Sequence, residues 1–325
     1  MRLGVAGLGG MGTVHAYNAA RLPGAELVAV ASTRPERASE VASELGVRAC
    51  GYAELVAAPG VDAIVVAARS IDHAEHALAV LAAGKHLFLE KPGATTVARQ
   101  EALCAAAASA DRVVQLGYHR RFDPRWTDAK RRIDTGEIGR PLLVIGVSRD
   151  VRLPEPEDPV PAGGFLLDMA SHDYDAASWF LGEEPVEVHV ARQSHVYPEL
   201  LELGDLDNAA VTVRFSGGGI AALHSSRTCP WGHDVRTEVV GDEGSLFIGN
   251  PPPGSNTDGF PQDYRELFAD AYVAELAAFV AACSGEEMKG AGVEDDRRAV
   301  AVGVAARASA VAGEPRTVGP DWPWP

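Results

Sequence analysis

The chain has 325 residues, 46% of them hydrophobic, so it exceeds the ~100 to 200 residues of one ordinary domain and can fill two cores. Asp and Glu number 45 against 29 Lys and Arg, and the resulting net charge of −16 disfavours a nucleic acid or an anionic membrane surface as partner. The four cysteines form no Cys-x-x-Cys pair. With no long apolar run and no room for a secretion signal before the first strand, a soluble cytoplasmic protein is expected.

Residues 1–118 alternate short apolar runs with longer Ala-rich stretches of helical character. This alternation is typical of βαβ units in a parallel sheet. The predicted strands are 3–6, 27–31, 63–67, 86–89 and 113–116, and the predicted helices are 12–22, 34–45, 73–83 and 98–110. We therefore expect an N-terminal doubly wound Rossmann domain of the α/β class.

Residues 119–325 have a different pattern, in which strands mostly alternate or follow hairpin-like turns. The predicted strands are 142–147, 186–191, 209–215, 219–225, 236–240 and 244–248, and the predicted helices are 169–180, 263–282 and 294–310. Such strands favour an open, mainly antiparallel sheet. The Pro-rich stretches 153–161 and 250–261 are expected to be ordered loops. The second domain is thus predicted to be α+β, for substrate binding and oligomerisation.

A glycine-rich segment joins the first predicted strand to the first predicted helix. It reads Gly7-Leu8-Gly9-Gly10-Met11-Gly12 and matches G-x-G-x-x-G. In this motif the first glycine permits a tight turn, the second lets the backbone approach a pyrophosphate, and the third lets the helix pack closely. A small-residue turn in any βα unit is the alternative, but the strand-loop-helix context favours a dinucleotide site.

The end of the second predicted strand bears on the choice of cofactor. NAD-selective proteins place an acidic residue there to bind the adenosine ribose, but this chain has Ser32. Ser32, Thr33, Arg34 and Arg37 instead offer hydroxyl and guanidinium groups that suit a 2′-phosphate. The segment therefore favours NADP, with NAD as the open alternative and solvated helix-start arginines as the alternative interpretation.

Two further segments hold side chains with catalytic potential. Glu90-Lys91-Pro92 directly follows the fourth predicted strand, and the carboxyl ends of parallel strands are where doubly wound sheets bind ligands. Glu90 and Lys91 are therefore expected at the cofactor. The segment 163–173 places Asp168 and His172 four residues apart, on one face of a helix predicted to begin near Met169. Because two ligands do not make a metal site, no metal is predicted.

With these motifs and the stretch 117–124, the chain resembles the Gfo/Idh/MocA family over nearly its whole length. The segments 181–188, 225–227 and 271–275 are similar to the inositol 2-dehydrogenase branch of that family. The resemblance implies that Lys91, Asp168 and His172 are catalytic. It implies hydride transfer between a nicotinamide cofactor and a secondary ring alcohol of a cyclitol or sugar. It also implies a homo-oligomer, a dimer or tetramer, formed through the open face of the second sheet.

The chemistry of this reaction suits the three residue types. Oxidation of an alcohol removes the hydroxyl proton as hydride leaves carbon, and His172 is the natural base near neutral pH. Lys91 can stabilise the negative charge on the substrate oxygen, and Asp168 can orient its cationic neighbours. A Lys-Asp salt bridge and a helix-capping Asp168 are the alternatives. By resemblance, the candidate substrate residues are Arg120, Arg121, Asp150, Arg152, Trp231, His233 and Tyr272; salt bridges or core packing are their alternative roles.

Three departures from the branch leave the substrate open. Ser32 replaces an acidic residue, Ala68-Arg69-Ser70 stands where Thr-Pro is common, and Trp231-Gly232-His233-Asp234 replaces Tyr-Gly-Tyr-Asp. A keto-sugar reductase of a biosynthetic pathway and an NAD-dependent glycosidase of the same fold are the alternative functions. A nucleotide-sensing regulator is the non-enzymatic alternative, which would not need the catalytic residues.

Overall fold

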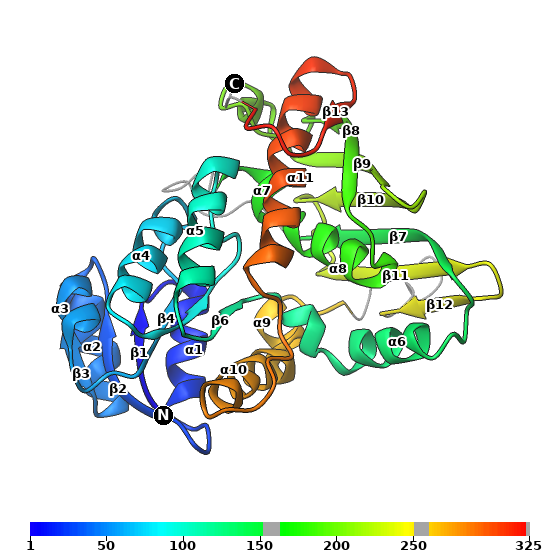
Figure 1. Cartoon of the computed structure of the whole chain (residues 1–325). Helices are drawn as coiled ribbons and strands as arrows, with labels where there is room; N and C mark the ends of the chain where they lie inside the picture. The colour runs from blue at the N-terminus through cyan, green and yellow to red at the C-terminus, as the bar shows by residue number, and fades with distance from the viewer. Residues whose placement is uncertain (152–162, 250–259, 323–325) are drawn as a thin grey trace. The chain divides into compact units, whose positions relative to one another are not determined.

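The computed structural model describes residues 1–151, 163–249 and 260–322, and its elements form two compact units (Figure 1). Unit 1 comprises Met1–Ala94, Ala98–Phe122 and Ala269–Arg297, and unit 2 comprises Thr95–Val97, Asp123–Phe268 and Arg298–Pro325. The predicted division into 1–118 and 119–325 is simpler, because it does not anticipate that a late segment of the chain belongs to unit 1. Both Pro-rich stretches fall largely outside the described residues.

Unit 1 is built on a parallel sheet with the strand order β3-β2-β1-β4-β5-β6. The strands are β1 (Arg2–Ala6), β2 (Glu26–Ala31), β3 (Arg48–Cys50), β4 (Ala63–Val66), β5 (His86–Leu89) and β6 (Val114–Leu116). The order reverses between β1 and β4, which is the switch point where such sheets bind ligands. This confirms the predicted Rossmann sheet. The sequence did not predict β3 or the following helix α3 (Tyr52–Ala57).

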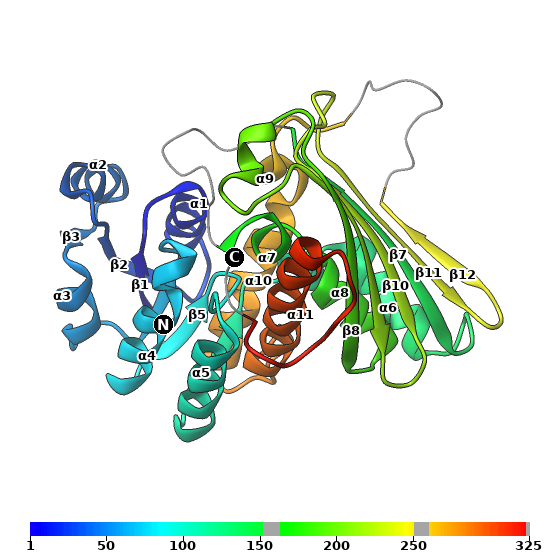
Figure 2. The same cartoon turned by 90° about the horizontal axis from the view of Figure 1, so that it is seen from above.

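Helices cover both faces of this sheet. Figure 2 shows α1 (Gly10–Ala19) and α2 (Pro35–Leu45) on one side, with α3, α4 (Ser70–Ala82) and α5 (Val97–Ser109) on the other. The helix α10 (Ala269–Cys283) lies on the same face of the sheet as α1. Its Phe279 packs in one buried cluster with Phe88 of β5 and Ala16 of α1. The sequence pattern predicts this helix in the second domain, so its place in unit 1 corrects that prediction.

Unit 2 is built on a seven-stranded sheet with the order β12-β11-β7-β10-β9-β8-β13. The strands are β7 (Pro141–Arg149), β8 (Pro185–Gln193), β9 (Asn208–Phe215), β10 (Ile220–Ser226), β11 (Asp234–Gly241), β12 (Ser245–Ile248) and β13 (Arg316–Thr317). Neighbours are antiparallel except for the central pair β7 and β10, which runs parallel. The predicted open, mainly antiparallel sheet is confirmed.

The two faces of this sheet differ in burial because side chains alternate along each strand. One face buries Val144, Leu223 and Val239. The helix α8 (Ser171–Leu181) packs there, and the hydroxyl of Ser148 donates to Asp173 at 2.9 Å. The other face, which we call the open sheet face, exposes Ile145, Ile220 and Phe247.

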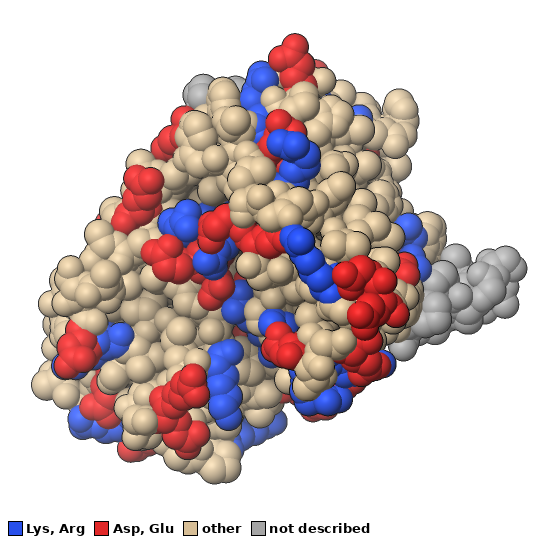
Figure 3. Space-filling model, turned by 45° about the vertical axis from the view of Figure 1, so that its right-hand side comes forward, with Lys and Arg blue, Asp and Glu red and all other residues tan. Residues whose placement is uncertain are grey.

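The remaining helices are short or terminal. They are η1 (His119–Phe122), α6 (Pro124–Asp134), α7 (Phe165–Asp168), η3 (Pro198–Leu201), α9 (Tyr264–Leu267) and α11 (Val293–Ala312). On the face drawn in Figure 3, Lys and Arg side chains lie among Asp and Glu side chains. Of the helices in the described ranges, none combines the length and apolarity needed to cross a bilayer.

Candidate active site

The glycine loop between β1 and α1 has the geometry of a phosphate-binding loop. Gly7 has a φ of +91°, and a Cβ there would lie 2.3 Å from the carbonyl oxygen of Ala67. A Cβ on Gly12 would lie 1.9 Å from the carbonyl oxygen of Gly7. A Cβ on Gly9, in contrast, would meet no atom within 4 Å. Gly7 and Gly12 are thus required by the fold, whereas Gly9 leaves open space that a pyrophosphate can approach.

The first turn of α1 adds an electrostatic preference to this loop. It begins at Gly10 and Met11, and it contains no acidic residue. The first backbone N–H groups of a helix lack partners within the helix, and the helix dipole favours negative charge there. The residues present therefore fit the pyrophosphate of a dinucleotide cofactor.

The predicted adenosine-side residues lie at the end of β2 and the start of α2. The hydroxyl of Ser32 accepts a hydrogen bond from the backbone N–H of Arg34 at 3.1 Å. Arg37 forms an ion pair with Glu40 at 2.8 Å and donates to the hydroxyl of Thr13 at 3.1 Å. Thr33 and Arg34 are exposed. A 2′-phosphate would find Arg34 accessible, but it would compete with Glu40 for Arg37.

Lys91 follows β5 in a segment that polar contacts hold in place. The backbone N–H of Lys91 donates to the side chain of Glu90 at 3.2 Å. The imidazole of His73, on α4, lies 2.8 Å from the carbonyl oxygen of Pro92 and 3.0 Å from that of Ala68. Burial is the main cause that lowers the pKa of His73, and the charge of Lys91 lowers it further. His73 could not be identified from the sequence, because a lone histidine in a predicted helix carries no distinct signal.

A buried aspartate fixes the same segment from a distant part of the chain. Asp296, at the start of α11, accepts from the backbone N–H of Gly93 at 2.9 Å and from the hydroxyl of Tyr118 at 2.7 Å. No local sequence pattern connects these residues, which are about two hundred positions apart. The geometry of the Lys91 segment therefore depends on residues that the motifs do not reveal.

Three of the candidate substrate residues also lie in unit 1, on η1 and α10. Arg120 is buried. Arg121 forms an ion pair with Asp295 at 3.0 Å. The ring of Tyr272 is buried against His119, with ring centroids 4.7 Å apart. The contacts of Arg121 and Tyr272 give these two residues a structural role, and contact of all three residues with substrate stays a prediction.

Asp168 and His172 lie in unit 2, and the structure corrects the helix on which they were placed. They do not share one helix beginning near Met169, because Asp168 ends α7 and His172 lies in α8, which begins at Ser171. The hydroxyl of Ser171 donates to the carbonyl oxygen of Asp168 at 2.9 Å. Both candidate side chains are half-buried. Whether they act together with Lys91 stays a prediction, since Lys91 belongs to unit 1.

A buried ion pair anchors the short helix that carries Asp168. Arg227 lies 2.7 Å from Asp205, and the second carboxylate oxygen of Asp205 accepts from the backbone N–H of Phe165 at 2.8 Å. The guanidinium group of Arg227 also lies over the Phe165 ring, 4.9 Å from its centroid. Asp205 thus satisfies a backbone donor in the first turn of α7. Arg227 belongs to a segment that carries the family resemblance, whereas no sequence signal pointed to Asp205.

Two candidate substrate residues meet at the ends of neighbouring strands of unit 2. Asp150 follows β7 and His233 precedes β11, and Nδ1 of His233 lies 3.1 Å from a carboxylate oxygen of Asp150. Trp231 is half-buried, and its carbonyl oxygen accepts from Gln262 at 3.0 Å. Arg152 lies outside the described residues. Asp150 and His233 therefore form one polar pair that can offer both donors and acceptors to a polyol.

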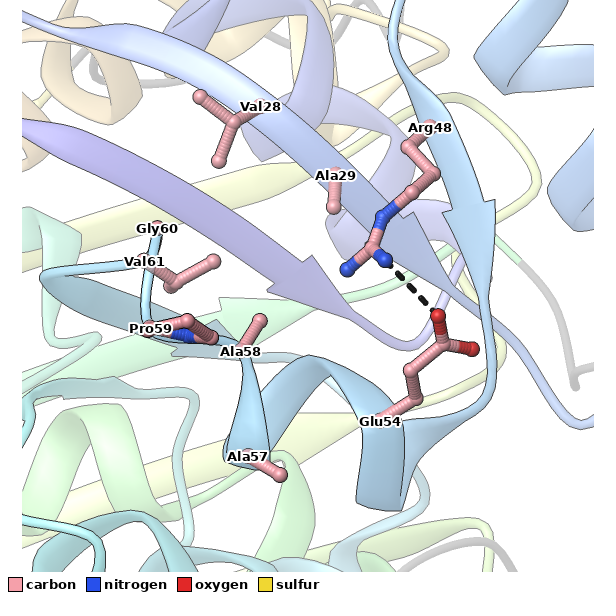
Figure 4. Close-up of a pocket in the computed structure, with 9 residues that line it drawn as sticks. All are labelled: Val28, Ala29, Arg48, Glu54, Ala57, Ala58, Pro59, Gly60 and Val61. Atoms are coloured by element: carbon pink, nitrogen blue, oxygen red, sulfur yellow. Dashed lines mark hydrogen bonds and ion pairs between the residues drawn. The ribbon is translucent and has the colours of Figure 1, made fainter.

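A cavity of about 490 Å³ lies elsewhere in unit 1. Figure 4 shows it between β2, β3 and residues 57–61, with Arg48 paired to Glu54 at its edge. Residues 57–61 lead into the amino end of β4, whereas the glycine loop follows the carboxyl end of β1. These are opposite edges of a parallel sheet, so the cavity is not the nucleotide site.

Comparison with known proteins identifies the family of the chain. Residues 1–118 match the family model described as "Oxidoreductase family, NAD-binding Rossmann fold", and residues 126–247 match "GFO/IDH/MocA C-terminal domain". The scyllo-inositol 2-dehydrogenase (NAD(+)) of Bacillus subtilis is 36% identical, over 86% of this chain and 85% of the relative. The myo-inositol 2-dehydrogenase of Thermotoga maritima is 33% identical, over 95% and 96% respectively.

Solved structures give the same result. The scyllo-inositol dehydrogenase of Lactobacillus casei, solved with bound NAD(H) and scyllo-inositol, has a TM-score of 0.90 and 29% identity, with 98% of each chain covered. A probable dehydrogenase from Thermotoga maritima has a TM-score of 0.90 and 32% identity, again with 98% of each chain covered. Together with the glycine loop and the Glu90-Lys91-Pro92 segment, these matches show that the chain belongs to the Gfo/Idh/MocA family of oxidoreductases.

Proposed function

We propose that this protein is a nicotinamide-dependent dehydrogenase that oxidises a secondary ring alcohol of a cyclitol, with myo-inositol and scyllo-inositol as the first substrates to test. The observation that carries the proposal is the open space at Gly9, which lies beside the switch point of the parallel sheet. Lys91 directly follows β5 of the same sheet. The names of the relatives support the choice of cyclitol. None of the named relatives favours a keto-sugar reductase or a glycosidase.

In the proposed mechanism, His172 removes the hydroxyl proton of the substrate. Lys91 donates a hydrogen bond to the same oxygen and stabilises the negative charge that develops on it. Asp168 orients the cationic partners. The cofactor, when bound, accepts the hydride. In the reducing direction His172 returns the proton.

Substrate recognition is proposed for Asp150 and His233 of unit 2. Their 3.1 Å contact involves one carboxylate oxygen of Asp150, and the second oxygen is the proposed acceptor for a ring hydroxyl. A polyol needs several directional donors and acceptors, so such a pair suits neighbouring hydroxyl groups. Trp231, Arg120, Arg121, Arg152 and Tyr272 complete the proposed set of substrate residues.

The residues at the end of β2, which would face the adenosine ribose, determine the choice between NAD and NADP. Ser32 offers no carboxylate to the ribose hydroxyls, and Arg34 is accessible to a 2′-phosphate, so these residues favour NADP. The relatives point the other way, because their printed names or titles refer to NAD(+) and NAD(H). The ratio of kcat/KM with NADP to that with NAD is therefore measured from the start.

The open sheet face is proposed to bind a second copy of the chain. Ile145, Ile220 and Phe247 lie on this face, at the registers that pair β7 with β10 and β11 with β12. Exposed apolar side chains gathered on one sheet face are typical of protein interfaces. The expected product is a dimer or tetramer, measured by analytical ultracentrifugation.

The proposed function is tested by screening inositols and pyranoses with NAD and NADP while recording absorbance of the reduced cofactor. We expect turnover of at least one cyclitol, and loss of turnover in Lys91→Ala and His172→Ala with cofactor binding retained. Lys130→Ala and the exposed His195→Ala are the matched controls and should remain active. Absence of turnover with every cyclitol and sugar would overturn the proposal.

A further inference from the structure

Three buried titratable side chains from distant parts of unit 1 come together at the start of the segment 90–93, which contains Lys91. They are His15 on α1, Glu90 directly after β5, and Glu275 on α10, and their ligand-type atoms lie within 4.8 Å of one another. His15 and Glu275 are 0% exposed, and Glu90 is 7% exposed. Nε2 of His15 lies 2.7 Å from a carboxylate oxygen of Glu90. Two carboxyl groups and one imidazole thus share a site from which water is excluded.

Glu275 is the unusual member of this cluster. Neither of its carboxyl oxygens has a hydrogen-bond partner among the described residues. Burial, and then the negative charge of Glu90, raise the pKa of Glu275 well above its ordinary value. Two neighbouring carboxyl groups in a low-dielectric site do not both ionise, because each charge would be desolvated and would repel the other. The less solvated group, Glu275, therefore keeps its proton.

Glu90 links this cluster to Lys91. One of its carboxylate oxygens faces His15, and the other accepts the backbone N–H of Lys91 at 3.2 Å. Gly117 leaves the space that Glu90 needs, because a Cβ there would lie 3.0 Å from the carboxyl group. The orientation and charge of Glu90 consequently affect both the backbone position of Lys91 and the field at its ammonium group.

We propose that Glu275, held as a neutral carboxylic acid, and His15 are positioning residues that orient the carboxylate of Glu90, and through Glu90 place the ammonium group of Lys91 for hydride transfer. This inference rests on the proposed function, because it assigns its effect to Lys91. The proton of Glu275 removes the repulsion between the two carboxyl groups, whose oxygens lie within 4.8 Å of each other. His15, on α1, contacts the carboxylate of Glu90 through Nε2 at 2.7 Å.

The other titratable groups around the cluster are consistent with this arrangement. Burial lowers the pKa of His73 on α4 and of His119 on η1, so both imidazoles are neutral near pH 7. After burial, charges on Arg120, Lys91 and His15 lower the pKa of His119 further. Glu90 is the acidic side chain of the cluster that is hydrogen-bonded to the backbone of Lys91.

The first experiment compares two substitutions of Glu275 that differ in hydrogen bonding. Glu275→Gln keeps an uncharged polar side chain of the same length beside Glu90, so kcat/KM and its pH profile should stay close to those of the wild type. Glu275→Leu places an apolar side chain beside the carboxylate of Glu90, which disfavours a negative charge there, so the acid limb of kcat/KM should move up by about one pH unit. A purely structural role would lower the stability of both variants without moving the limb.

Two further variants complete this series. Glu90→Gln removes the negative charge beside Lys91, so kcat/KM should fall on the order of tenfold and the alkaline limb should move to lower pH. Glu54→Gln, at an exposed ion pair of the same unit, is the matched control and should change neither limb. An unchanged profile in Glu275→Leu, or a Glu275→Gln profile displaced as far as that of Glu275→Leu, would overturn the inference.

The second experiment does not depend on activity. The infrared difference spectrum of wild type minus Glu275→Gln at pH 7 should contain the carbonyl stretch of a protonated carboxyl group, and its absence would overturn the inference. Because one imidazole and two carboxyl groups are also metal ligands, elemental analysis accompanies the spectrum. One metal ion per chain, lost in Glu275→Gln, would likewise overturn it. If the wild type turns over no cyclitol, the proposed function fails, while the spectrum still reports the state of Glu275.

Discussion

The buried pair of Arg227 and Asp205 gives the most quantitative prediction for unit 2. Their side chains are 4% and 3% exposed, so Asp205→Asn would leave the charge of Arg227 in the interior without a counter-ion. Removal of one partner from a buried pair typically costs about 3–5 kcal/mol. The asparagine oxygen can still accept from the backbone N–H of Phe165, which retains about 1 kcal/mol. We therefore expect Asp205→Asn to lower the free energy of unfolding by about 3 kcal/mol.

Urea unfolding followed by tryptophan fluorescence measures this loss in unit 2 itself. All five tryptophans of the chain fall within the residues assigned to unit 2. The control is Asp128→Asn on α6, which removes an ion pair with Arg131 whose side chains are 53% and 65% exposed. Exposed pairs contribute about 0–1 kcal/mol, so the control should change stability little. Equal losses in the two variants would refute the argument that burial determines the cost.

Four further predictions concern the other sites. Gly12→Ala should weaken NADH binding on the order of tenfold or more in a fluorescence titration, because its Cβ would displace the carbonyl group of Gly7, whereas Gly51→Ala should bind normally. Ser32→Asp should shift the kcat/KM ratio toward NAD, and an unchanged ratio would contradict the role of Ser32. The raised pKa of Glu275 favours folding below the usual value of 4.5, and this stability is lost as pH rises through the folded-state value. Above pH 4.5, the free energy of unfolding of Glu275→Gln should therefore rise relative to that of the wild type, by at most about 1.4 kcal/mol per pH unit, as measured by urea unfolding. A difference between the two proteins that does not change with pH would mean that Glu275 is ionised in the folded protein. Phe247→Glu on the open sheet face should lower the sedimenting mass, and a wild type that sediments as a monomer would rule out that interface.

The regular parts of both units could be predicted from the sequence because their signals are local. Alternating strands and helices, together with the glycine loop, are sufficient to indicate the Rossmann sheet. The strand β3 was not predicted because it has only three residues and is largely exposed. The helix α6 could have been found, since Asp123 caps its start and Pro124 occupies its first position.

The contacts that fix the candidate site could not be predicted in the same way. Asp205 and Asp296 act on backbone N–H groups far from them in sequence, and an isolated aspartate does not indicate such a partner. The break between α7 and α8 is similar, because the spacing of Asp168 and His172 fits one continuous helix. Tertiary contacts determine where α7 begins and ends. One of them is the hydrogen bond from the backbone N–H of Phe165 to Asp205.

The place of α10 in unit 1 determines when that unit can finish folding during synthesis. Leu276, Phe279 and Val280 belong to the same buried cluster as Leu3 and Val5, so the core is incomplete until the chain beyond residue 280 has left the ribosome. The strands β7 to β12 emerge before α10 and can pair while the first sheet still exposes apolar surface. A fragment ending at residue 118 would lack this helix permanently. The apolar residues of β1 are therefore fully covered only after α10 has been synthesised.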